Sequence, residues 1–401
     1  MKIRQKSEFE FIVIMAALMS LVSLAIDALL PAMTNIGDTI GIINATNNQL
    51  LITMIFLGLG FGQLISGPLS DSYGRKPIIY IGFIVFAFAS LICVFSTSLE
   101  MMIVGRIAQG IGLSAPRTIS IAMIRDRFSG NYMAKVMSFV VAIFILVPVV
   151  APALGKIMLD LYGWQSIFYS QLLFGLAVML WLWKRQPETL KKENKRDFKL
   201  ALLIAGLKEF IKHKNAVIFT FFSGCITGSF MVYLSASQLI FEQQYNLKDE
   251  FPFIFAGIAF FIGIATFLNG TFVVRLGMFK LVSIFTIIFT LIPFVYIFLY
   301  SGETNPSIYV LVTFFGLQFF AIAFLFGNTR ALAMEPIGHI AGIGAAINGF
   351  VSTIMAVPIA IWIGSFINTT ALPLFIGFFV CGVIALLLIQ YLNFSNKKKV
   401  S

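Results

Sequence analysis

The chain has 401 residues, of which 59% are hydrophobic and only 11% are charged, whereas a soluble domain averages roughly 25% charged residues. This composition excludes a water-soluble fold, and continuous apolar runs of about 20 residues favour membrane-spanning helices over the alternating strands of a barrel. The formal net charge of +11 does not indicate nucleic-acid binding, because the basic residues gather in the connections between these runs.

Twelve apolar runs of membrane-spanning length follow one another along the chain. They cover residues 9–33, 49–69, 78–96, 101–122, 134–158, 165–183, 215–240, 251–274, 281–300, 307–333, 341–366 and 370–393. If the chain starts in the cytoplasm, the outer loops contain only Lys156 and Lys248, and nearly all other Lys and Arg residues fall in the inner loops. Because cytoplasmic loops are enriched in Lys and Arg, this split predicts that both termini are cytoplasmic.

The first run, 9–33, carries an acidic residue at membrane depth. It is too long for the apolar core of a signal peptide and ends without a small-residue cleavage site, so we interpret it as a retained helix. At about 1.5 Å per residue, Asp27 falls beyond the midplane in the outer half of the membrane. A charge at this depth costs several kcal/mol unless it is paired, which makes Asp27 a candidate functional residue.

A short charged turn connects the second and third spans. It reads Gly67-Pro68-Leu69-Ser70-Asp71-Ser72-Tyr73-Gly74-Arg75-Lys76-Pro77. We expect Gly67 and Gly74 to supply backbone freedom and the two prolines to mark helix ends. The chain must reverse within a few residues, and this places Asp71 and Arg75 at the membrane interface.

Two arginines lie inside the fourth span. Arg106 falls at the depth of Asp27, which predicts a direct or water-bridged contact between them; a purely structural ion pair is the alternative. Arg117 follows after close to three helical turns, so both guanidiniums project from one face. We expect this face to line a cavity, together with Gln109.

The fifth span contains two prolines, Pro148 and Pro152, followed by Gly155. Each proline removes a helix hydrogen bond and favours bending, so this segment is a candidate hinge, with a tolerated membrane kink as the alternative. The bend is expected to pack against the eighth span, which carries Gly257, Gly263 and Gly270.

The longest polar stretch runs from Lys184 to Asn215 and separates two halves of six spans each. We therefore divide the chain into an N-terminal bundle, 1–186, a cytoplasmic linker, 187–214, and a C-terminal bundle, 215–401. Within the linker, a basic run of Lys191, Lys192, Lys195 and Arg196 precedes Phe198–Ile211, whose apolar spacing predicts an amphipathic helix on the inner leaflet. A solvated tether is the alternative.

The second half offers neutral polar residues for a cavity, although each can equally serve as a hydrogen bond between helices; they are Tyr233, Asn269, Gln318, Asn328 and Asn348. Three cysteines lie in apolar spans, and His213 and His339 fall at predicted cytoplasmic ends. The sequence thus indicates no disulfide framework, no metal site and no cofactor.

Five segments carry a resemblance to a known family. Residues 67–76 resemble the loop signature G-x-L-x-D-x-x-G-R-K of the major facilitator superfamily, and residues 106–112 resemble its span-four pattern R-x-x-Q-G-x-G. Residues 27–31 resemble the D-x-x-L-P pattern of drug:proton antiporters. Pro152 and Gly155 match part of the antiporter signature of span five, whose leading glycines are absent. Together with Ile124-Arg125-Asp126, these features resemble the bicyclomycin-resistance/chloramphenicol-efflux branch.

The resemblance implies an all-α membrane protein of twelve helices in two six-helix bundles, which exports a small compound in exchange for protons by alternating access. It makes Asp27 the proton carrier and Arg106 the residue that tunes it. It also implies an inner conformational latch, in which Arg75 pairs with Asp126 and Asp71 faces the positive N-terminus of span eleven.

Other functions remain open at this point. The exporter could carry an endogenous metabolite or a siderophore, and a proton-coupled importer would use the same residues. An intramembrane enzyme is disfavoured because the spans contain no HExxH, no paired aspartates and no Gly-x-Ser-x-Gly. We expect a monomer in a bacterial inner membrane whose partners are lipid, protons and a small-molecule substrate, without nucleic acid.

Overall fold

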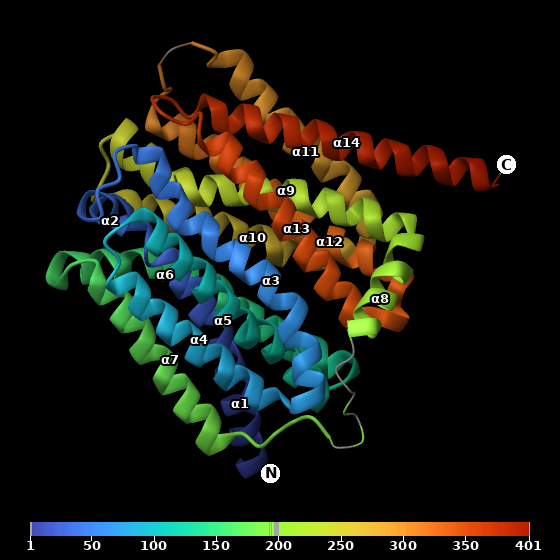
Figure 1. The fold of residues 1–401 in the computed structure, drawn as a ribbon. Coiled ribbons are helices and arrows are strands. Elements are labelled where there is room, and N and C mark those ends of the chain that lie inside the picture. The colour runs from blue at the N-terminus through green and yellow to red at the C-terminus, as the bar shows by residue number, and fades with distance from the viewer. Residues whose placement is uncertain (1, 192, 194, 196–199, 303, 401) are drawn as a thin grey trace. The chain divides into compact units, whose positions relative to one another are not determined.

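The computed structural model describes residues 2–191, 193, 195, 200–302 and 304–400. These residues form helices joined by short connections, and no strand occurs among them (Figure 1). The chain divides between Leu200 and Ala201 into an N-terminal unit and a C-terminal unit. The all-α prediction is confirmed, and the division falls inside the segment 187–214 that the sequence suggests as a linker.

The helices of the N-terminal unit follow the first six predicted spans. They are α1 (Lys2–Asp27), the 3₁₀ helix η1 (Leu30–Ala32), α2 (Met33–Thr39), the 3₁₀ helix η2 (Ala45–Gln49), α3 (Leu50–Tyr73), α4 (Arg75–Val94), α5 (Leu99–Arg127), α6 (Gly130–Tyr162) and α7 (Gln165–Arg185). The first predicted span therefore contains a break, since α1 ends at Asp27 and a 3₁₀ turn follows.

The helices of the C-terminal unit begin with the short α8. They are α8 (Leu200–Lys212), α9 (Lys214–Gln238), the π-helical segment η4 (Leu239–Gln244), α10 (Phe251–Leu276), α11 (Met278–Leu299), α12 (Ile308–Met334), the 3₁₀ segment η5 (Glu335–Ile340), α13 (Ala341–Gly364) and α14 (Leu372–Val400). Each of the last six predicted spans thus corresponds to a long helix.

Ten helical segments of the described residues are long and apolar enough to cross a membrane, judged by length and composition. Helices α5 and α6, which match the fourth and fifth predicted spans, are not among them. In α5, the polar side chains of Arg106, Gln109 and Arg117 lower the hydropathy. Arg106 and Gln109 have no exposed surface, so these polar side chains lie in the interior of the N-terminal unit.

Helices α3 and α5 touch backbone to backbone. A Cβ at Gly110 of α5 would lie 2.0 Å from the carbonyl oxygen of Ile55, and one at Gly58 of α3 would lie 1.9 Å from that of Ile107. Only glycine fits at both places, as in other membrane helices that pack through small residues. This contact brings α5 close enough for Arg106 to reach the backbone of α3.

The C-terminal unit is arranged around α9, which is buried along most of its length and contacts α12, α13 and α14. Helix α8 is the predicted amphipathic helix. Its Phe210 is buried with Ile337 and Ile347, while Ile204 and Ile211 are exposed. The predicted positions Lys192, Arg196, Phe198 and Lys199 lie outside the described residues, and the location on the inner leaflet stays a prediction.

An ion-pair group marks the junction between α8 and α9. Glu209 accepts hydrogen bonds from Lys212 Nζ at 3.1 Å and pairs with His213 Nε2 at 3.2 Å. The contact with Lys212, followed by that with His213, lowers the pKa of Glu209. The contacts of Glu209 therefore stabilise the junction between α8 and α9 while Glu209 is ionised. This stabilisation is lost as the pH falls through the lowered pKa of Glu209.

Candidate functional site

Arg106 of α5 has no exposed surface, and its hydrogen bonds with the described residues are all to neutral groups. Its Nε donates to the carbonyl oxygen of Leu51 at 2.6 Å, and its Nη1 donates to Gln109 Oε1 at 2.7 Å. Both Nη atoms lie 3.2 Å from the carbonyl oxygen of Ala25. Carbonyl and amide dipoles, rather than a carboxylate, thus stabilise this guanidinium, which joins α1, α3 and α5.

The carbonyl of Ala25 is available because α1 ends two residues later. Pro31 has no N–H with which to bond the carbonyl of Asp27, so the α-helical pattern stops and η1 begins. The last carbonyls of a helix carry partial negative charge, which favours a cation. Arg106 therefore stabilises the C-terminal end of α1.

Gln109 extends this polar contact from α5 to α4. Its Oε1 accepts from Arg106, and its Nε2 donates to Ser90 Oγ at 2.7 Å. Ser90 in turn donates to the carbonyl oxygen of Phe86 at 2.8 Å. Gln109 is fully buried and both its polar atoms are bonded, so it supports Arg106 in this structure instead of presenting an open polar end.

Asp27 is the last residue of α1, and only 4% of it is exposed. The hydroxyl of Ser23, one turn earlier, donates to its Oδ2. Among the described residues, no Lys or Arg forms an ion pair with Asp27. The carboxyl group is therefore held by a neutral donor.

The predicted direct contact between Asp27 and Arg106 is absent. Arg106 does reach the end of α1, since it bonds the carbonyl of Ala25, only two residues before Asp27. The end of α1 supplies carbonyl acceptors that the sequence reading did not include, and the guanidinium binds these in place of the carboxylate. A water-bridged contact stays a prediction.

Helix α6 packs against the break in α1. A Cβ at Gly155 would lie 1.9 Å from the carbonyl oxygen of Ala28, so only glycine fits this contact. The helix continues without interruption through Pro148 and Pro152. Gly155 of the candidate hinge thus lies beside Ala28, the residue that follows Asp27, while the packing of the hinge against the eighth span stays a prediction.

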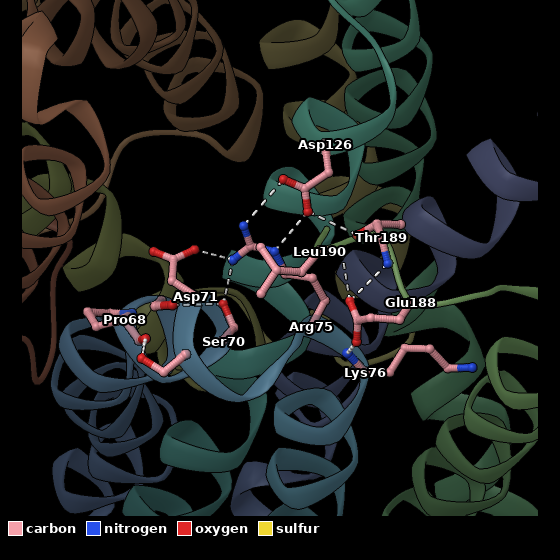
Figure 2. Close-up of polar contacts among 11 residues, drawn as sticks. Pro68, Ser70, Asp71, Arg75, Lys76, Asp126, Glu188, Thr189 and Leu190 are labelled. Carbon is pink, nitrogen blue, oxygen red and sulfur yellow. Dashed lines mark hydrogen bonds and ion pairs between the residues drawn. The ribbon is translucent and has the colours of Figure 1, made fainter. Parts of the chain in front are cut away.

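The charges of the α3–α4 turn form the second cluster, which we call the latch (Asp71, Arg75 and Asp126; Figure 2). Arg75 Nη1 lies 2.5 Å from Asp71 Oδ1 and 2.8 Å from Ser70 Oγ. Its Nε and Nη2 donate to the two oxygens of Asp126 at 2.9 and 3.3 Å. The predicted Arg75–Asp126 pair is therefore present, and the Arg75 side chain is only 8% exposed.

The turn itself is shorter than predicted. Helix α3 continues to Tyr73, so Gly67 and Pro68 lie inside it, and the prediction that Pro68 marks its end was wrong. Proline already has a helical φ and costs the helix one hydrogen bond, which α3 accommodates. Gly74 alone makes the turn, at φ 112°, a conformation that favours glycine.

Arg117 differs from Arg106 in its surroundings. Arg117 is half-buried, whereas Arg106 is fully buried. The carbonyl of Arg117 accepts a hydrogen bond from Ser120 Oγ at 3.1 Å. The two arginines thus share a helix without sharing an environment, and the lining of a cavity by Arg117 stays a prediction.

Two of the predicted polar residues of the C-terminal unit connect helices. Gln318 Nε2 of α12 donates to the carbonyl oxygen of Phe289 at 3.2 Å. Asn348 Nδ2 of α13 donates to Thr220 Oγ1 at 2.7 Å. Both side chains are buried, with exposures of 0% and 3%, so the structure favours a role in helix packing for them.

Asn328 Nδ2 donates to Asn269 Oδ1 at 2.7 Å, which joins α12 to α10. Tyr233 is different, because its ring packs against Phe319 and Phe315 with centroids 4.4 and 5.0 Å away. Its hydroxyl has no hydrogen-bond partner among the described residues. Among the predicted residues of this unit, the hydroxyl of Tyr233 and the Oε1 atom of Gln318 are the buried polar groups without a hydrogen-bond partner among the described residues.

Sequence reasoning missed a buried acid in the C-terminal unit. Glu242 lies in η4, inside the candidate span Lys214–Gln244, and is 9% exposed. Gln238 Nε2 donates to its Oε2 at 2.8 Å. Glu242 was not among the predicted cavity residues because the seventh predicted span ends at residue 240, whereas the π-helical segment η4 continues it to Gln244.

Glu188 and Thr189 were also missed. They follow α7, and the sequence reading assigned them to the linker, but they bond the latch residues and α4 (Figure 2). No local pattern identifies such contacts, because their partners lie far away in the sequence.

Comparison with known proteins agrees with this fold. A sequence profile described as the Major Facilitator Superfamily matches residues 13–361. The chain is 29% identical over 403 residues to a bicyclomycin resistance protein homolog of Haemophilus influenzae, covering 98% of this chain and 99% of that one. It is 26% identical to the multidrug resistance protein MdtL of Salmonella paratyphi C, covering 86% and 87%.

A solved structure shares the architecture at low sequence identity. The crystal structure of a D-xylose–proton symporter superimposes with a TM-score of 0.71 over 96% of each chain, at 14% identity. At this identity the likeness shows the fold alone. With the profile covering most of its length, the chain belongs to the Major Facilitator Superfamily and is a multi-pass membrane transporter rather than an enzyme.

Proposed function

We propose that the chain exports small, moderately hydrophobic compounds in exchange for protons, by alternating access, across a bacterial inner membrane with both termini in the cytoplasm. The names of its relatives support export, since one is a bicyclomycin resistance protein homolog and another a multidrug resistance protein. The distribution of Lys and Arg supports the orientation.

One observation supports proton coupling above all others: a buried carboxyl group at a helix break with only a neutral partner. Asp27 is bonded to Ser23 and forms no ion pair with a described residue. It can therefore gain or lose a proton without leaving a cation unpaired. A structural ion pair would lack this freedom, because protonation would break it.

Arg106 is proposed to tune this exchange from a fixed position. Its charge is stabilised by the carbonyls of Ala25 and Leu51, independently of the protonation state of Asp27. Any movement of the end of α1 changes both the Arg106 contact and the surroundings of Asp27. Packing of Gly155 on Ala28 connects the same break to α6.

The latch is proposed as the cytoplasmic gate. Arg75 lies between Asp71 and Asp126, and such ion pairs at a partly exposed surface can break and re-form at low cost. Gly74 permits the tight turn, and Gly67 lies within the last turns of α3. The contact of Asp71 with the N-terminus of span eleven, and cavity roles for Arg117 and Tyr233, remain part of this proposal.

Everted membrane vesicles test the exchange, with bicyclomycin as the probe. Respiration acidifies the lumen, and addition of bicyclomycin should release protons from vesicles that carry the native chain. Asp27→Asn should abolish this release while the protein stays in the membrane. Asp38→Asn is the matched control, because Asp38 is an exposed acid of the following helix.

The outcomes separate the candidate functions. Full proton release with Asp27→Asn would remove Asp27 from the mechanism. If bicyclomycin has no effect but a metabolite or a siderophore releases protons, the chain is an exporter of endogenous compounds. Proton-driven uptake into intact cells would instead identify an importer.

A further inference from the structure

Among the five residues that follow α7, Gln186 and Glu188 are bonded to Lys76 at the start of α4, and Thr189 is bonded to Asp126 of the latch. We call this segment, Gln186–Leu190, the strap. Figure 2 shows Glu188 and Thr189 beside Lys76, Arg75 and Asp126. The strap is the first part of the connection to the C-terminal unit, so the latch and the connection are in direct contact.

Glu188 caps the N-terminus of α4. The capping position is Gly74, which has no side chain to bond the first N–H groups of the helix. Glu188 Oε2 accepts the N–H of Lys76 at 3.0 Å, and its Oε1 accepts those of Thr189 and Leu190 at 2.9 and 3.0 Å. A carboxylate at a helix N-terminus is stabilised by the helix dipole as well as by these bonds.

Lys76 caps α7 in return. Its Nζ donates to the carbonyl oxygen of Gln186 at 2.6 Å and lies 3.4 Å from that of Trp183. The cation therefore faces the C-terminal end of α7, where helix carbonyls lack partners. Each helix end is closed by a side chain from the other helix or its extension, so the strap is held at both of its ends.

Thr189 connects the strap to the latch. Its hydroxyl donates to Asp126 Oδ2 at 3.0 Å, the same oxygen that accepts from Arg75 Nε at 2.9 Å. One carboxylate thus receives both the latch arginine and the strap threonine. Moving Asp126 away from Arg75 also disturbs the bond to Thr189.

We propose that the strap is a positioning element of the transport cycle: Glu188 and Thr189 hold Asp126 for Arg75 while the latch is closed, and the strap detaches when the latch opens. This proposal rests on the proposed function of the latch as the cytoplasmic gate. Detachment frees five residues, which at about 3.3–3.6 Å each add up to roughly 17 Å of extended chain before α8. The connection is thereby short in one state and long in the other.

A distance measurement within the N-terminal unit tests detachment without any substrate. Spin labels at Tyr73→Cys and Lys191→Cys, both at exposed positions, report the separation of the strap from the α3–α4 turn by double electron–electron resonance. The three native cysteines, which are buried, are replaced by alanine. The otherwise native strap should give one narrow short distance as its main component.

Two variants should release the strap. Glu188→Gln removes the charge that caps α4, and Thr189→Val removes the hydroxyl donor at nearly constant shape. Loss of a hydrogen bond to a charged group should raise the detached population about tenfold, as a longer and broader component. Thr189→Ser should restore the narrow distance, and Glu193→Gln, five residues beyond Glu188, should leave it unchanged.

A transport measurement then shows whether the strap positions Asp126 during transport or only stabilises the fold. In vesicles, Thr189→Val should lower kcat for bicyclomycin-driven proton release several-fold, by roughly the cost of one hydrogen bond, and leave KM nearly unchanged. The same substitution should have no further effect in an Asp126→Asn background, because its partner is already altered.

The results decide the proposal in either direction. A narrow distance in both Glu188→Gln and Thr189→Val overturns it, and so does a released strap with unchanged kcat. If bicyclomycin drives no proton release even in the native chain, that result counts against the proposed function, while the distance measurement still decides whether the strap detaches.

Discussion

The N-terminal unit contains two arginines whose charges are stabilised by different kinds of partner. Arg106 is fully buried and bonded only to neutral acceptors, while Arg75 lies near the surface between two carboxylates. The first can lose its contacts only by leaving backbone groups without partners. The second can exchange its partners for water.

This difference indicates which part of the unit is fixed and which part can move. Buried carbonyls without a donor cost about 1–3 kcal/mol each, so the contacts of Arg106 should persist throughout the cycle. The Asp71 and Asp126 side chains of the latch are 46% and 20% exposed, so water can replace them as partners and the latch should open at a lower cost than the contacts of Arg106. Substitutions at the two places should therefore act on different properties, stability at Arg106 and conformational equilibrium at Arg75.

The largest effect is expected for Arg106→Leu. This change leaves the carbonyls of Ala25 and Leu51 and the amide of Gln109 without their donor, and it should destabilise the folded protein by at least about 3 kcal/mol. Thermal unfolding in detergent should show a clearly lower melting temperature. Arg117→Leu, the same change at a half-buried position of α5, should lower it much less; equal shifts would contradict the distinction drawn for Arg106.

The next largest effect should come from Gly155→Ala. The added methyl group would meet the carbonyl of Ala28, and overpacking of this kind costs about 1–3 kcal/mol. Gly257→Ala is the matched control, since a Cβ there meets nothing within 4 Å. A reduced melting temperature for Gly155→Ala alone would support tight packing at the α1 break, whereas two unaffected variants would show that α6 can shift away.

Much of this arrangement could be predicted from the sequence, because a membrane restricts the choices. Long apolar runs can only be helices, the buried charges must be shielded, and the charged turn after α3 must lie at an interface. These arguments identified Asp27 and Arg106 as candidates, whereas the resemblance to a known family implied the Arg75–Asp126 pair. They depend on composition and depth, which the sequence states directly.

The partners of these residues were harder to predict, because many are backbone atoms. Arg106 binds the carbonyl of Ala25 near the end of α1 and that of Leu51 in α3, and Glu188 caps α4 through the N–H of Lys76, 112 positions earlier in the chain. No residue pattern marks a carbonyl as an acceptor for a distant side chain. Pro68 was misplaced because the sequence does not distinguish a proline within the last turns of a helix from a proline at its end.

A smaller effect is expected for Arg75→Lys. Lysine keeps the charge but has no planar fork to bind Asp126 through two nitrogens while also reaching Asp71. The closed latch should lose roughly 1 kcal/mol, with a melting temperature close to that of the native chain. Hydrogen–deuterium exchange should be several-fold faster in peptides covering the α3–α4 turn. Arg125→Lys, at the exposed neighbour of Asp126, is the control and should not change the exchange rate. If the exchange rate of the α3–α4 turn is unchanged in both variants, the latch does not need the planar guanidinium of Arg75.

The smallest effect should follow Ser23→Ala, which removes the hydrogen bond that Asp27 receives. One hydrogen bond to a buried carboxyl group contributes about 1–3 kcal/mol at most, so proton release driven by bicyclomycin should be slower but retained. Ser20→Ala is the control, because Ser20 bonds only the carbonyl of Ala16 in its own helix, at 2.7 Å. If Ser23→Ala abolished proton release as completely as Asp27→Asn, the hydroxyl would have to be part of the proton path. The carboxyl group alone could then no longer be the carrier, and the fixed region around Arg106 would hold a proton relay of two groups.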